Sequence, residues 1–272
     1  HQDVYRAGDG VHRVWLQRRQ HFAQWGRAPF VCAGRFHRNM MQLEARTFDP
    51  ANTRHIIVNS DMVRREILEH FHFPANRIHL VRNGIDLDRY RRGQRNATRE
   101  RFGIKPDDTL LLFVGSGWER KGLRFVLRAF HRLKAPRVRL LVVGKGTPPL
   151  AVPEGVIFAG PMSDVENAYA AADLLVFLPI YEPSSNVVAE ALVSDLPVIT
   201  SSLNGASEII TPRKNGTVIA DPRDTDAVVE AIRFWILQRG QAEMPPKHEL
   251  SLERNVEETL AVLELAAQEK RQ

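Results

Sequence analysis

The sequence YEPSSNVVAEAL at residues 181–192 stands between two short apolar runs, and this arrangement decides the fold. The run before it is ADLLVFLP at residues 172–179, and the run after it is LPVIT at residues 196–200. Continuous apolar runs of this length are typical of strands buried on both faces of a parallel sheet. Ser184 is a predicted N-cap for a helix that continues to about Val193. The helix N-terminus therefore opens at the carboxyl end of a strand, where open α/β sheets bind ligands.

Two carboxylates bracket the start of this helix, Glu182 before the predicted cap and Glu190 two turns into the helix. A rise of about 1.5 Å per residue places Glu190 roughly 9 Å along the axis from the cap. The N–H groups of Ser185, Asn186 and Val187 carry partial positive charge and can take a phosphate. This spacing fits a ligand with a sugar at one end, a nucleoside at the other and phosphates between, because carboxylates accept hydrogen bonds from paired hydroxyls. Two exposed acids on an amphipathic helix are the alternative.

The two glutamates form an E-x7-E pattern followed by LPVIT, and this sequence resembles the retaining glycosyltransferases of family 4, which have the GT-B fold. The resemblance implies that Glu182 contacts hydroxyls of the donor sugar and that Glu190 holds the ribose of the sugar nucleotide. The sequence departs from the family at Ser185, where a glycine is common, and at Asp195, which replaces the usual glycine before Leu196. The first departure bears on how closely the backbone approaches the donor, and the second on a turn.

The composition is that of a globular protein large enough for two modest domains or one large one. The chain has 272 residues, of which 43% are hydrophobic and 26% charged. The single cysteine, Cys32, excludes an internal disulfide and favours a reducing, cytoplasmic compartment. The net charge of +6 suits an anionic partner such as a nucleotide sugar, a membrane surface or a nucleic acid. No apolar run is long enough to span a bilayer, and the start at His1 predicts a processed or partial sequence.

The first hundred residues predict an α/β domain with a short sheet. The expected strands are residues 3–7, 54–59 and 77–81. The expected helices are residues 11–24 after a cap at Asp9, residues 35–48 with an apolar stripe of Phe36, Met40, Leu43 and Thr47, and residues 60–70 capped by Ser60. Three short strands are too few for the N-terminal sheet of the family, so the resemblance implies a partial domain that lacks the acceptor-side catalytic residues.

The first of these helices combines aromatic and basic residues. The aromatic residues are Trp15, Phe22 and Trp25, and the basic residues are Arg13, Arg18, Arg19 and Arg27. Helices that lie in a membrane interface have this composition. The alternative is that the aromatic residues face the core while the arginines face water. We expect the basic face to bind anionic lipid in either case.

From Thr109 the strands and helices alternate regularly, which predicts a parallel sheet with helices on both faces. The expected strands are residues 110–114, 138–143, 156–158, 172–179, 196–200 and 216–219. The expected helices are residues 124–133, 165–171, 184–193, 207–210, 225–237 and 251–268. The predicted organisation is a partial N-terminal domain with its linker at residues 1–105, a complete Rossmann-like domain at 106–245, and a C-terminal helix at 246–272 that returns to the first domain. The arginine-rich segment 89–101 is expected to be a solvated helix or linker.

The sequence GSGWERKG at residues 115–122 joins a strand to a helix and carries two adjacent cations, Arg120 and Lys121. Its spacing matches neither a P-loop nor a Rossmann fingerprint, and a capped helix with surface charges is the alternative. The resemblance implies that this loop, with Ser116 and Gly117, grips the donor pyrophosphate. Lys121 matches the family lysine, and Arg-Lys-Gly occurs at this point in the lipopolysaccharide core glucosyltransferases. Ser116 stands where many members of the family have arginine.

Three further motifs have counterparts near the donor site of the family, and a simple turn is the alternative for each. They are the Asn83-Gly84 pair of an N-G-I-D sequence, Lys145 between two glycines, and Gly205 in the sequence NGASE. Tyr181 is expected to pack near the donor, and a buried aromatic residue of the core is the alternative. No cluster of His, Cys and Asp has metal-ligand spacing, so no protein-bound metal or other cofactor is expected.

The resemblance implies transfer of a sugar from a nucleotide sugar, most simply a UDP-sugar, to a hydroxyl of a glycan or glycolipid. Retention of configuration without a carboxylate nucleophile implies a front-face mechanism, in which Arg120 and Lys121 stabilise the leaving phosphate. Relatives that build the lipopolysaccharide core work at the inner face of the membrane, so peripheral attachment is expected. A nucleotide-sugar-binding fragment without transfer activity, and an epimerase or phosphorylase on the same scaffold, remain open. A nucleic-acid binder is disfavoured because no recognised motif or stacking platform is present.

Overall fold

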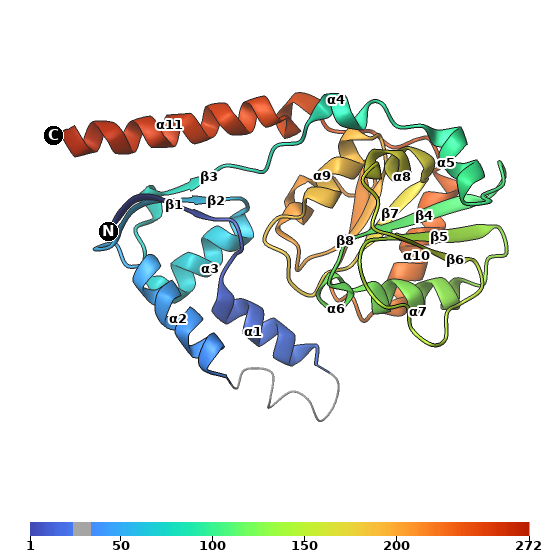
Figure 1. Cartoon of the computed structure of the whole chain (residues 1–272), viewed down its shortest axis with the longest axis horizontal. Helices are drawn as coiled ribbons and strands as arrows, with labels where there is room; N and C mark the ends of the chain where they lie inside the picture. The colour runs from blue at the N-terminus through green and yellow to red at the C-terminus, as the bar shows by residue number, and fades with distance from the viewer. Residues whose placement is uncertain (24–33, 272) are drawn as a thin grey trace. The chain divides into compact units, whose positions relative to one another are not determined.

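The computed structural model describes residues 1–23 and 34–271, which pack into two compact units (Figure 1). Unit 1 comprises His1–Gly84, Tyr181–Ser184 and Leu252–Gln272, and unit 2 comprises Ile85–Ile180 and Ser185–Ser251. Each unit is an α/β structure with its own parallel sheet, as predicted for a GT-B type fold. Residues 85–105, which the sequence placed with the first domain, pack in unit 2 instead.

Unit 2 contains a six-stranded parallel sheet in the order β6-β5-β4-β7-β8-β9. The strands are β4 (Thr109–Val114), β5 (Val138–Val143), β6 (Val156–Gly160), β7 (Leu174–Phe177), β8 (Val198–Ser201) and β9 (Gly216–Ile219). The chain builds outward from β4 to β6, then returns to the other side of β4 with β7 and continues to β9. The strand order therefore reverses between β4 and β7, and this switch point leaves an opening at the carboxyl ends of the strands.

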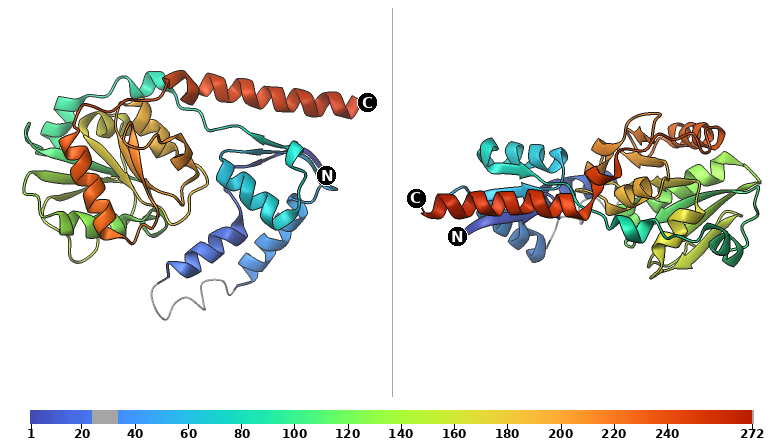
Figure 2. Two further views of the ribbon diagram at one scale, coloured as in Figure 1. Left: turned by 180° about the vertical axis from the view of Figure 1, so that it is seen from behind. Right: turned by 90° about the horizontal axis from the view of Figure 1, so that it is seen from above.

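Helices cover both faces of this sheet. The helices of unit 2 are α4 (Leu87–Tyr90), α5 (Arg95–Arg101), α6 (Trp118–Lys121), α7 (Leu123–Leu133), α8 (Val165–Ala171), α9 (Asn186–Val193) and α10 (Thr225–Leu237), with 3-10 turns η3 (Gly205–Ile209) and η4 (Lys247–Leu250). Helices α7 and α10 pack side by side, and α10 lies in front of the sheet when unit 2 is seen from behind (Figure 2). Helices α8 and α9 contact each other as well as β4, β7 and β8. The predicted bounds of α8, α10, β5 and β9 are confirmed.

The arginine-rich segment that contains α5 packs against the rest of unit 2 through Arg95 and Arg99. Asp173, which immediately precedes β7, pairs with Arg95 at 2.7 Å, Arg99 at 3.3 Å and Arg239 at 3.0 Å. The same carboxylate accepts a hydrogen bond from the backbone N–H of Leu110 in β4. Arg99 also donates to backbone carbonyls of residues 105, 108 and 171, and its side chain is 7% exposed. The prediction of a solvated helix or linker therefore fails for Arg95 and Arg99, which satisfy a buried carboxylate and buried carbonyl groups, whereas most other residues of segment 89–101 are exposed.

Unit 1 has a three-stranded parallel sheet in the order β1-β2-β3. The strands are β1 (Gln2–Ala7), β2 (Thr53–Val58) and β3 (Ile78–Leu80), and the helices are α1 (His12–His21), α2 (Arg35–Thr47), α3 (Asp61–Phe71), the 3-10 turn η2 (Ala75–Arg77) and α11 (Leu252–Arg271). Ser60 caps α3 as predicted, because its side chain accepts from the N–H of Val63. The predicted cap of α1 at Asp9 is wrong, since the cap residue is Val11.

Helix α2 packs through a carboxylate rather than through its apolar stripe. Phe36 and Leu43 of the predicted stripe are 65% and 57% exposed, whereas Glu44 is buried. The carboxylate of Glu44 accepts from the N–H groups of His12 and Arg13, so it satisfies the first turn of α1 from outside that helix. Unpaired N–H groups at a helix start need such a partner, which explains why an acid occupies the packed position.

Helix α11 packs on β1 and β2 of unit 1, although residues 185–251 separate it in sequence from the rest of that unit. His55, buried in β2, contacts Glu269 at 2.9 Å, and Lys270 pairs with Asp3 at 2.9 Å. Along residues 1–23 and 34–271, no helix is both long and apolar enough to cross a membrane.

Asp173→Asn should lower the free energy of unfolding of unit 2 by about 3 kcal/mol, because three arginines then lose their shared buried carboxylate. Calorimetric unfolding is the measurement, with Asp107→Asn as the matched control. The Asp107 carboxylate is 81% exposed and pairs only with the exposed Arg137 among the contacts described, so its loss should cost less than about 1 kcal/mol. Equal effects of the two substitutions would contradict a structural role for the Asp173 cluster.

Candidate nucleotide-sugar site

The loops after β4 and β5 meet at the carboxyl edge of the unit 2 sheet. The hydroxyl of Ser116 accepts from the N–H of Lys145 at 3.0 Å, and the indole of Trp118 donates to the carbonyl of Gly115 at 3.0 Å. Gly144 has φ +133°, and a Cβ atom there would overlap the Gly115 carbonyl. The glycine therefore allows the two loops to touch, which brings Lys145 next to the loop that carries Arg120 and Lys121.

The loop after β4 is also joined to the chain that leaves β7. The N–H of Ile180 donates to the carbonyl of Arg120 at 2.9 Å, and the Lys121 ammonium lies 5.5 Å from the centre of the Phe177 ring. Gly122 has φ +78°, and a Cβ atom there would overlap the carbonyl of Leu178. Arg120 and Lys121 are thus held at the switch point between β4 and β7, where a phosphate-binding role needs them.

The start of α9 differs in detail from the prediction. The cap residue is Ser185 rather than Ser184, and the Ser185 side chain makes no cap hydrogen bond to the helix. The N–H of Ser185, expected to face a phosphate, donates instead to the Asn204 side chain at 3.3 Å. Asn204 is fully buried, also accepts from Ala206 and donates to Thr200, and so ties the start of α9 to the turn that contains the buried Gly205. Asn186 and Val187 form the first turn of α9, as expected.

Glu190 is oriented by tyrosines of unit 2. The hydroxyl of the buried Tyr169 donates to Glu190 at 2.6 Å, and the rings of Tyr90 and Tyr169 pack edge to face at 5.6 Å. Burial, and then the charge of Glu190, raise the pKa of Tyr169 well above its usual range, so this tyrosine remains a donor. The same two causes raise the pKa of Tyr90. A neutral donor held in this way fixes the direction of the carboxylate.

The remaining predicted residues lie in unit 1. Tyr181 is 2% exposed and its ring stacks on Trp15, so its position supports the packing alternative rather than direct contact with a ligand. Glu182 follows it and is 8% exposed. The Asn83 amide donates to the carbonyl of Ser184 at 3.3 Å, which makes the Asn83-Gly84 turn part of the support for the Tyr181–Ser184 segment.

The structure therefore groups the predicted site residues in two sets. Unit 2 holds Ser116, Gly117, Arg120, Lys121, Lys145, Ser185, Asn186, Val187, Glu190 and Gly205, and unit 1 holds Asn83, Gly84, Tyr181 and Glu182. The residues that sequence reasoning missed are the supports, Asn204, Tyr169 and Tyr90. Asn204 stood inside the quoted NGASE motif, whereas nothing in the sequence distinguished the two tyrosines from ordinary core residues.

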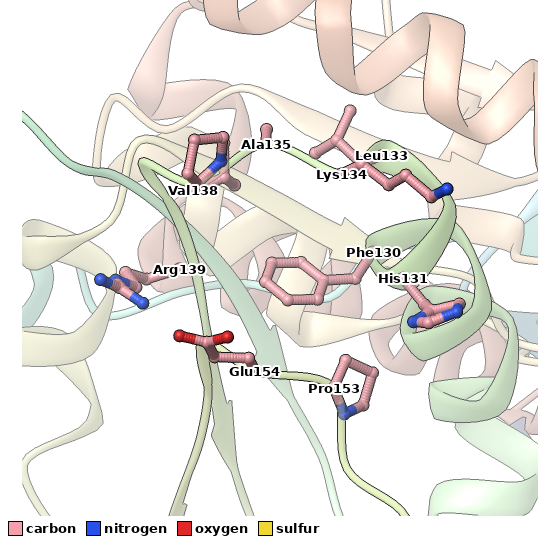
Figure 3. Close-up of a pocket in the computed structure, with 10 residues that line it drawn as sticks. Phe130, His131, Leu133, Lys134, Ala135, Val138, Arg139, Pro153 and Glu154 are labelled. Carbon is pink, nitrogen blue, oxygen red and sulfur yellow. The ribbon is translucent and has the colours of Figure 1, made fainter.

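Over the described parts of the chain, no group of three or more His, Cys, Asp or Glu side chains could hold a metal ion. A cavity of about 460 Å³ lies in unit 2, but at the opposite edge of the sheet, where the α7–β5 connection and the chain before β6 meet (Figure 3). It is lined by residues such as Phe130, Lys134, Arg139 and Glu154. The cavity and the predicted donor loops do not coincide, and the geometry of the loops is the better guide to the chemistry.

Comparison with known proteins identifies the family. A model of the group 1 glycosyl transferases matches residues 108–237, and a model of glycosyltransferase family 4 matches residues 10–89. The chain belongs to the family 4 glycosyltransferases. The lipopolysaccharide glucosyltransferase WaaG of Escherichia coli K12 is 30% identical over 217 residues, which cover 74% of this chain and 58% of WaaG. A D-inositol 3-phosphate glycosyltransferase of Catenulispora acidiphila is 31% identical over 202 residues, which cover 65% of this chain and 47% of that protein.

Solved structures agree with this assignment. The crystal structure of WaaG, a glycosyltransferase involved in lipopolysaccharide biosynthesis, matches with a TM-score of 0.75 at 26% identity, covering 96% of this chain and 70% of that one. Anabaena HepE, solved in complex with UDP-glucose, matches with a TM-score of 0.67 at 16% identity, covering 85% and 67% of the two chains. The second likeness shows the fold alone. The family 4 chain described here spans about half the length of the curated relatives named above, between 47% and 58%.

Gly122→Ala should destabilise unit 2 more than Gly103→Ala does. Both glycines have positive φ, +78° and +65°, so alanine costs roughly 1–2 kcal/mol at either position. Only Gly122 faces a backbone carbonyl, because nothing lies within 4 Å of a Cβ atom at Gly103. Calorimetric unfolding should therefore show a loss at least about 1 kcal/mol larger for Gly122→Ala. Equal losses would mean that the approach of the Arg120–Gly122 turn to the β7 loop is not tight.

Proposed function

We propose that this protein is a retaining glycosyltransferase that moves a sugar from a nucleotide-sugar donor to a hydroxyl of a glycan or glycolipid. The observation that carries the proposal is the arrangement at the unit 2 switch point. Lys121 and Arg120 lie on α6, the short helix that follows β4, and Glu190 lies on α9, the helix that follows the neighbouring strand β7. This arrangement offers cations for a diphosphate and a carboxylate for a ribose at one edge of one sheet.

The donor class is proposed to be a UDP-sugar. HepE has the same fold and was solved with UDP-glucose and with UDP, which supports a uridine nucleotide without naming the sugar for this chain. Glu190 would accept hydrogen bonds from the ribose hydroxyls, and Glu182 from hydroxyls of the donor sugar. Lys145, held to Ser116 through its backbone, would lie beside the nucleotide.

The proposed chemistry is a front-face displacement. The bond between the anomeric carbon and the diphosphate oxygen breaks, the acceptor oxygen bonds to that carbon on the same face, and the acceptor proton passes to the departing phosphate. Arg120 and Lys121 would stabilise the negative charge that grows on that phosphate, which is an electrostatic contribution. Positioning of donor and acceptor supplies the remainder.

The acceptor is proposed to be a membrane-bound glycolipid such as the lipopolysaccharide core. The similarity to WaaG over 74% of this chain supports this class. Residues Arg13, Arg18 and Arg19 on α1 are exposed, which supports contact with an anionic surface. Phe22 is buried and Trp15 packs on Tyr181, so these aromatic side chains face the core, as in the second alternative drawn from the sequence. Trp25 and Arg27 lie outside the described residues.

Glu190→Ala should weaken binding of both UDP and UDP-glucose, whereas Glu182→Ala should weaken only UDP-glucose. The reason is that UDP contains the ribose but no donor sugar. Loss of a hydrogen bond to a charged group costs about 1.5–3 kcal/mol, which corresponds to at least a tenfold change in Kd. Isothermal titration calorimetry with each ligand is the measurement, and Glu230→Ala on α10 serves as the control for removal of an exposed helix glutamate.

Equal losses for both ligands in both variants would contradict the assigned roles. Tight binding with no transfer to any acceptor glycolipid would favour a nucleotide-sugar-binding module over an enzyme.

Replacing Arg18 and Arg19 by glutamine should reduce binding to anionic vesicles about tenfold or more, because each basic residue near such a surface contributes about 1 kcal/mol. Vesicle sedimentation at low and high salt is the measurement, and the binding should fall with salt. The matched control replaces the exposed Arg128 and Arg137 of unit 2, which changes the net charge equally. Vesicle binding that does not depend on salt, or an equal loss of vesicle binding in both variants, would show that α1 is not the surface that contacts the membrane.

A further inference from the structure

The Tyr181–Ser184 segment is held by unit 1, although the residues on both sides of it in sequence belong to unit 2. This segment carries Glu182, the glutamate proposed to contact the donor sugar. The position of Glu182 therefore depends on the side chains of unit 1 that hold the Tyr181–Ser184 segment in place. None of these side chains belongs to the E-x7-E pattern itself.

Hydrogen bonds to three residues of the segment fix its path. The Tyr181 hydroxyl accepts from the N–H of Val11 at 2.8 Å and donates to the Glu66 carboxylate at 2.7 Å. The hydroxyl of Ser60 donates to the carbonyl of Pro183 at 2.6 Å. Together with the bond from Asn83 to Ser184, these contacts leave the segment little freedom on either side of Glu182.

A glycine in unit 1 makes room for this arrangement. Gly10 has φ +76°, and a Cβ atom there would overlap the Tyr181 hydroxyl and lie 2.7 Å from the Pro183 ring. The turn before α1 is thus in direct contact with the segment, and Tyr181 cannot shift toward it. The hydroxyl must remain between Val11 and Glu66.

Glu66 is the titratable member of this group. It lies on α3, and the charged groups that act on it are Arg18 from α1, Glu44 from α2 and Glu69 from α3 itself. Burial is the largest influence and raises the pKa of Glu66 to about 7, against the lowering effect of the Tyr181 hydrogen bond. Burial also raises the pKa of Tyr181, so the tyrosine is the donor in this pair.

We propose that Glu66 is a positioning residue for the donor sugar, because its hydrogen bond to Tyr181 fixes the segment that presents Glu182. This inference rests on the proposed function. When Glu66 is ionised, the bond from Tyr181 is charge-assisted and about twice as strong as a neutral one. Protonation weakens the bond, so recognition of the donor sugar should improve as the pH rises through 7. Recognition of UDP, which lacks the sugar, should not depend on Glu66.

Ionisation of Glu66 is expected to improve recognition of the donor sugar but to lower the stability of the fold. A carboxyl group whose pKa is raised from 4.5 to about 7 in the folded state stabilises the fold at low pH, and this stability is lost as the pH rises from about 4.5 to 7. Glu66→Gln keeps an oxygen acceptor for Tyr181 but does not ionise. Its melting temperature should therefore equal or exceed that of the wild type at pH 8, which separates a positioning effect from misfolding.

The test compares the Kd values of UDP-glucose and UDP at pH 6 and pH 8 by calorimetry. The proteins are the wild type, Glu66→Gln, Tyr181→Phe and the control Glu257→Gln, which changes an exposed glutamate of α11 in the same unit. In the wild type and in Glu257→Gln, the preference for UDP-glucose over UDP should rise several-fold between the two pH values. In Glu66→Gln it should rise less. The terminal phosphate of UDP ionises near pH 6, whereas UDP-glucose has no such group, so the comparison is made between variants at each pH.

Tyr181→Phe should lower the preference for UDP-glucose about fivefold or more at pH 8 while leaving the Kd of UDP unchanged. An unchanged preference and unchanged pH dependence in both Glu66→Gln and Tyr181→Phe would overturn the inference alone. Failure of the wild type to bind either ligand would overturn the proposed function, and this inference with it.

Discussion

Strands β4 and β7 are neighbours in the sheet but not in the chain, and this pairing decides where unit 2 can bind a ligand. From β4 the chain crosses to β5 and β6 on one side, and from β7 it crosses to β8 and β9 on the other side. The connections that follow β4 and β7 therefore lead in opposite directions at the carboxyl edge of the sheet. At the amino end the two strands are joined by Asp173, which precedes β7 and accepts from Leu110 of β4. The three arginines around Asp173 stabilise the closed end of the pair, while the open end carries Lys121 and Glu190. The pairing of β4 with β7 thus explains the positions of both the Asp173–arginine cluster and the candidate site.

Much of the fold could be predicted from local sequence pattern. Helix α10 and strands β5 and β9 were predicted at their observed bounds because strong periodicity or continuous apolar runs agree there with tertiary burial. Ser60 was recognised as a cap because its chemistry acts within one turn of helix. The residues at the switch point were recognised by motif, and the sheet order explains why residues from separate motifs lie at one edge of unit 2.

The sequence predictions that were wrong share one physical cause. In each case a polar side chain forms hydrogen bonds with residues that are distant in the sequence. Arg95 and Arg99 of α5 looked like solvated charges because Asp173 lies more than seventy residues later. The apolar stripe predicted for α2 is wrong at Phe36 and Leu43 because the buried position of that helix belongs to Glu44, whose partners are N–H groups of α1. Tyr181 looked like a ligand contact because its real partners, Glu66 and Val11, lie in another part of the sequence. The periodicity of a sequence shows which residues share one face of a helix or strand. It does not show which distant residues they contact.

The central claim is that the loop after β4 binds the diphosphate of a nucleotide at the β4–β7 switch point. Calorimetric titration of the wild type and Lys121→Ala with UDP and with uridine tests it most directly, because uridine lacks the diphosphate. We predict that Lys121→Ala weakens UDP binding at least tenfold while the affinity for uridine stays the same, since the lysine acts as a point charge on phosphate. Equal effects on both ligands, or none on either, would return Lys121 to the role of a surface charge and contradict the account.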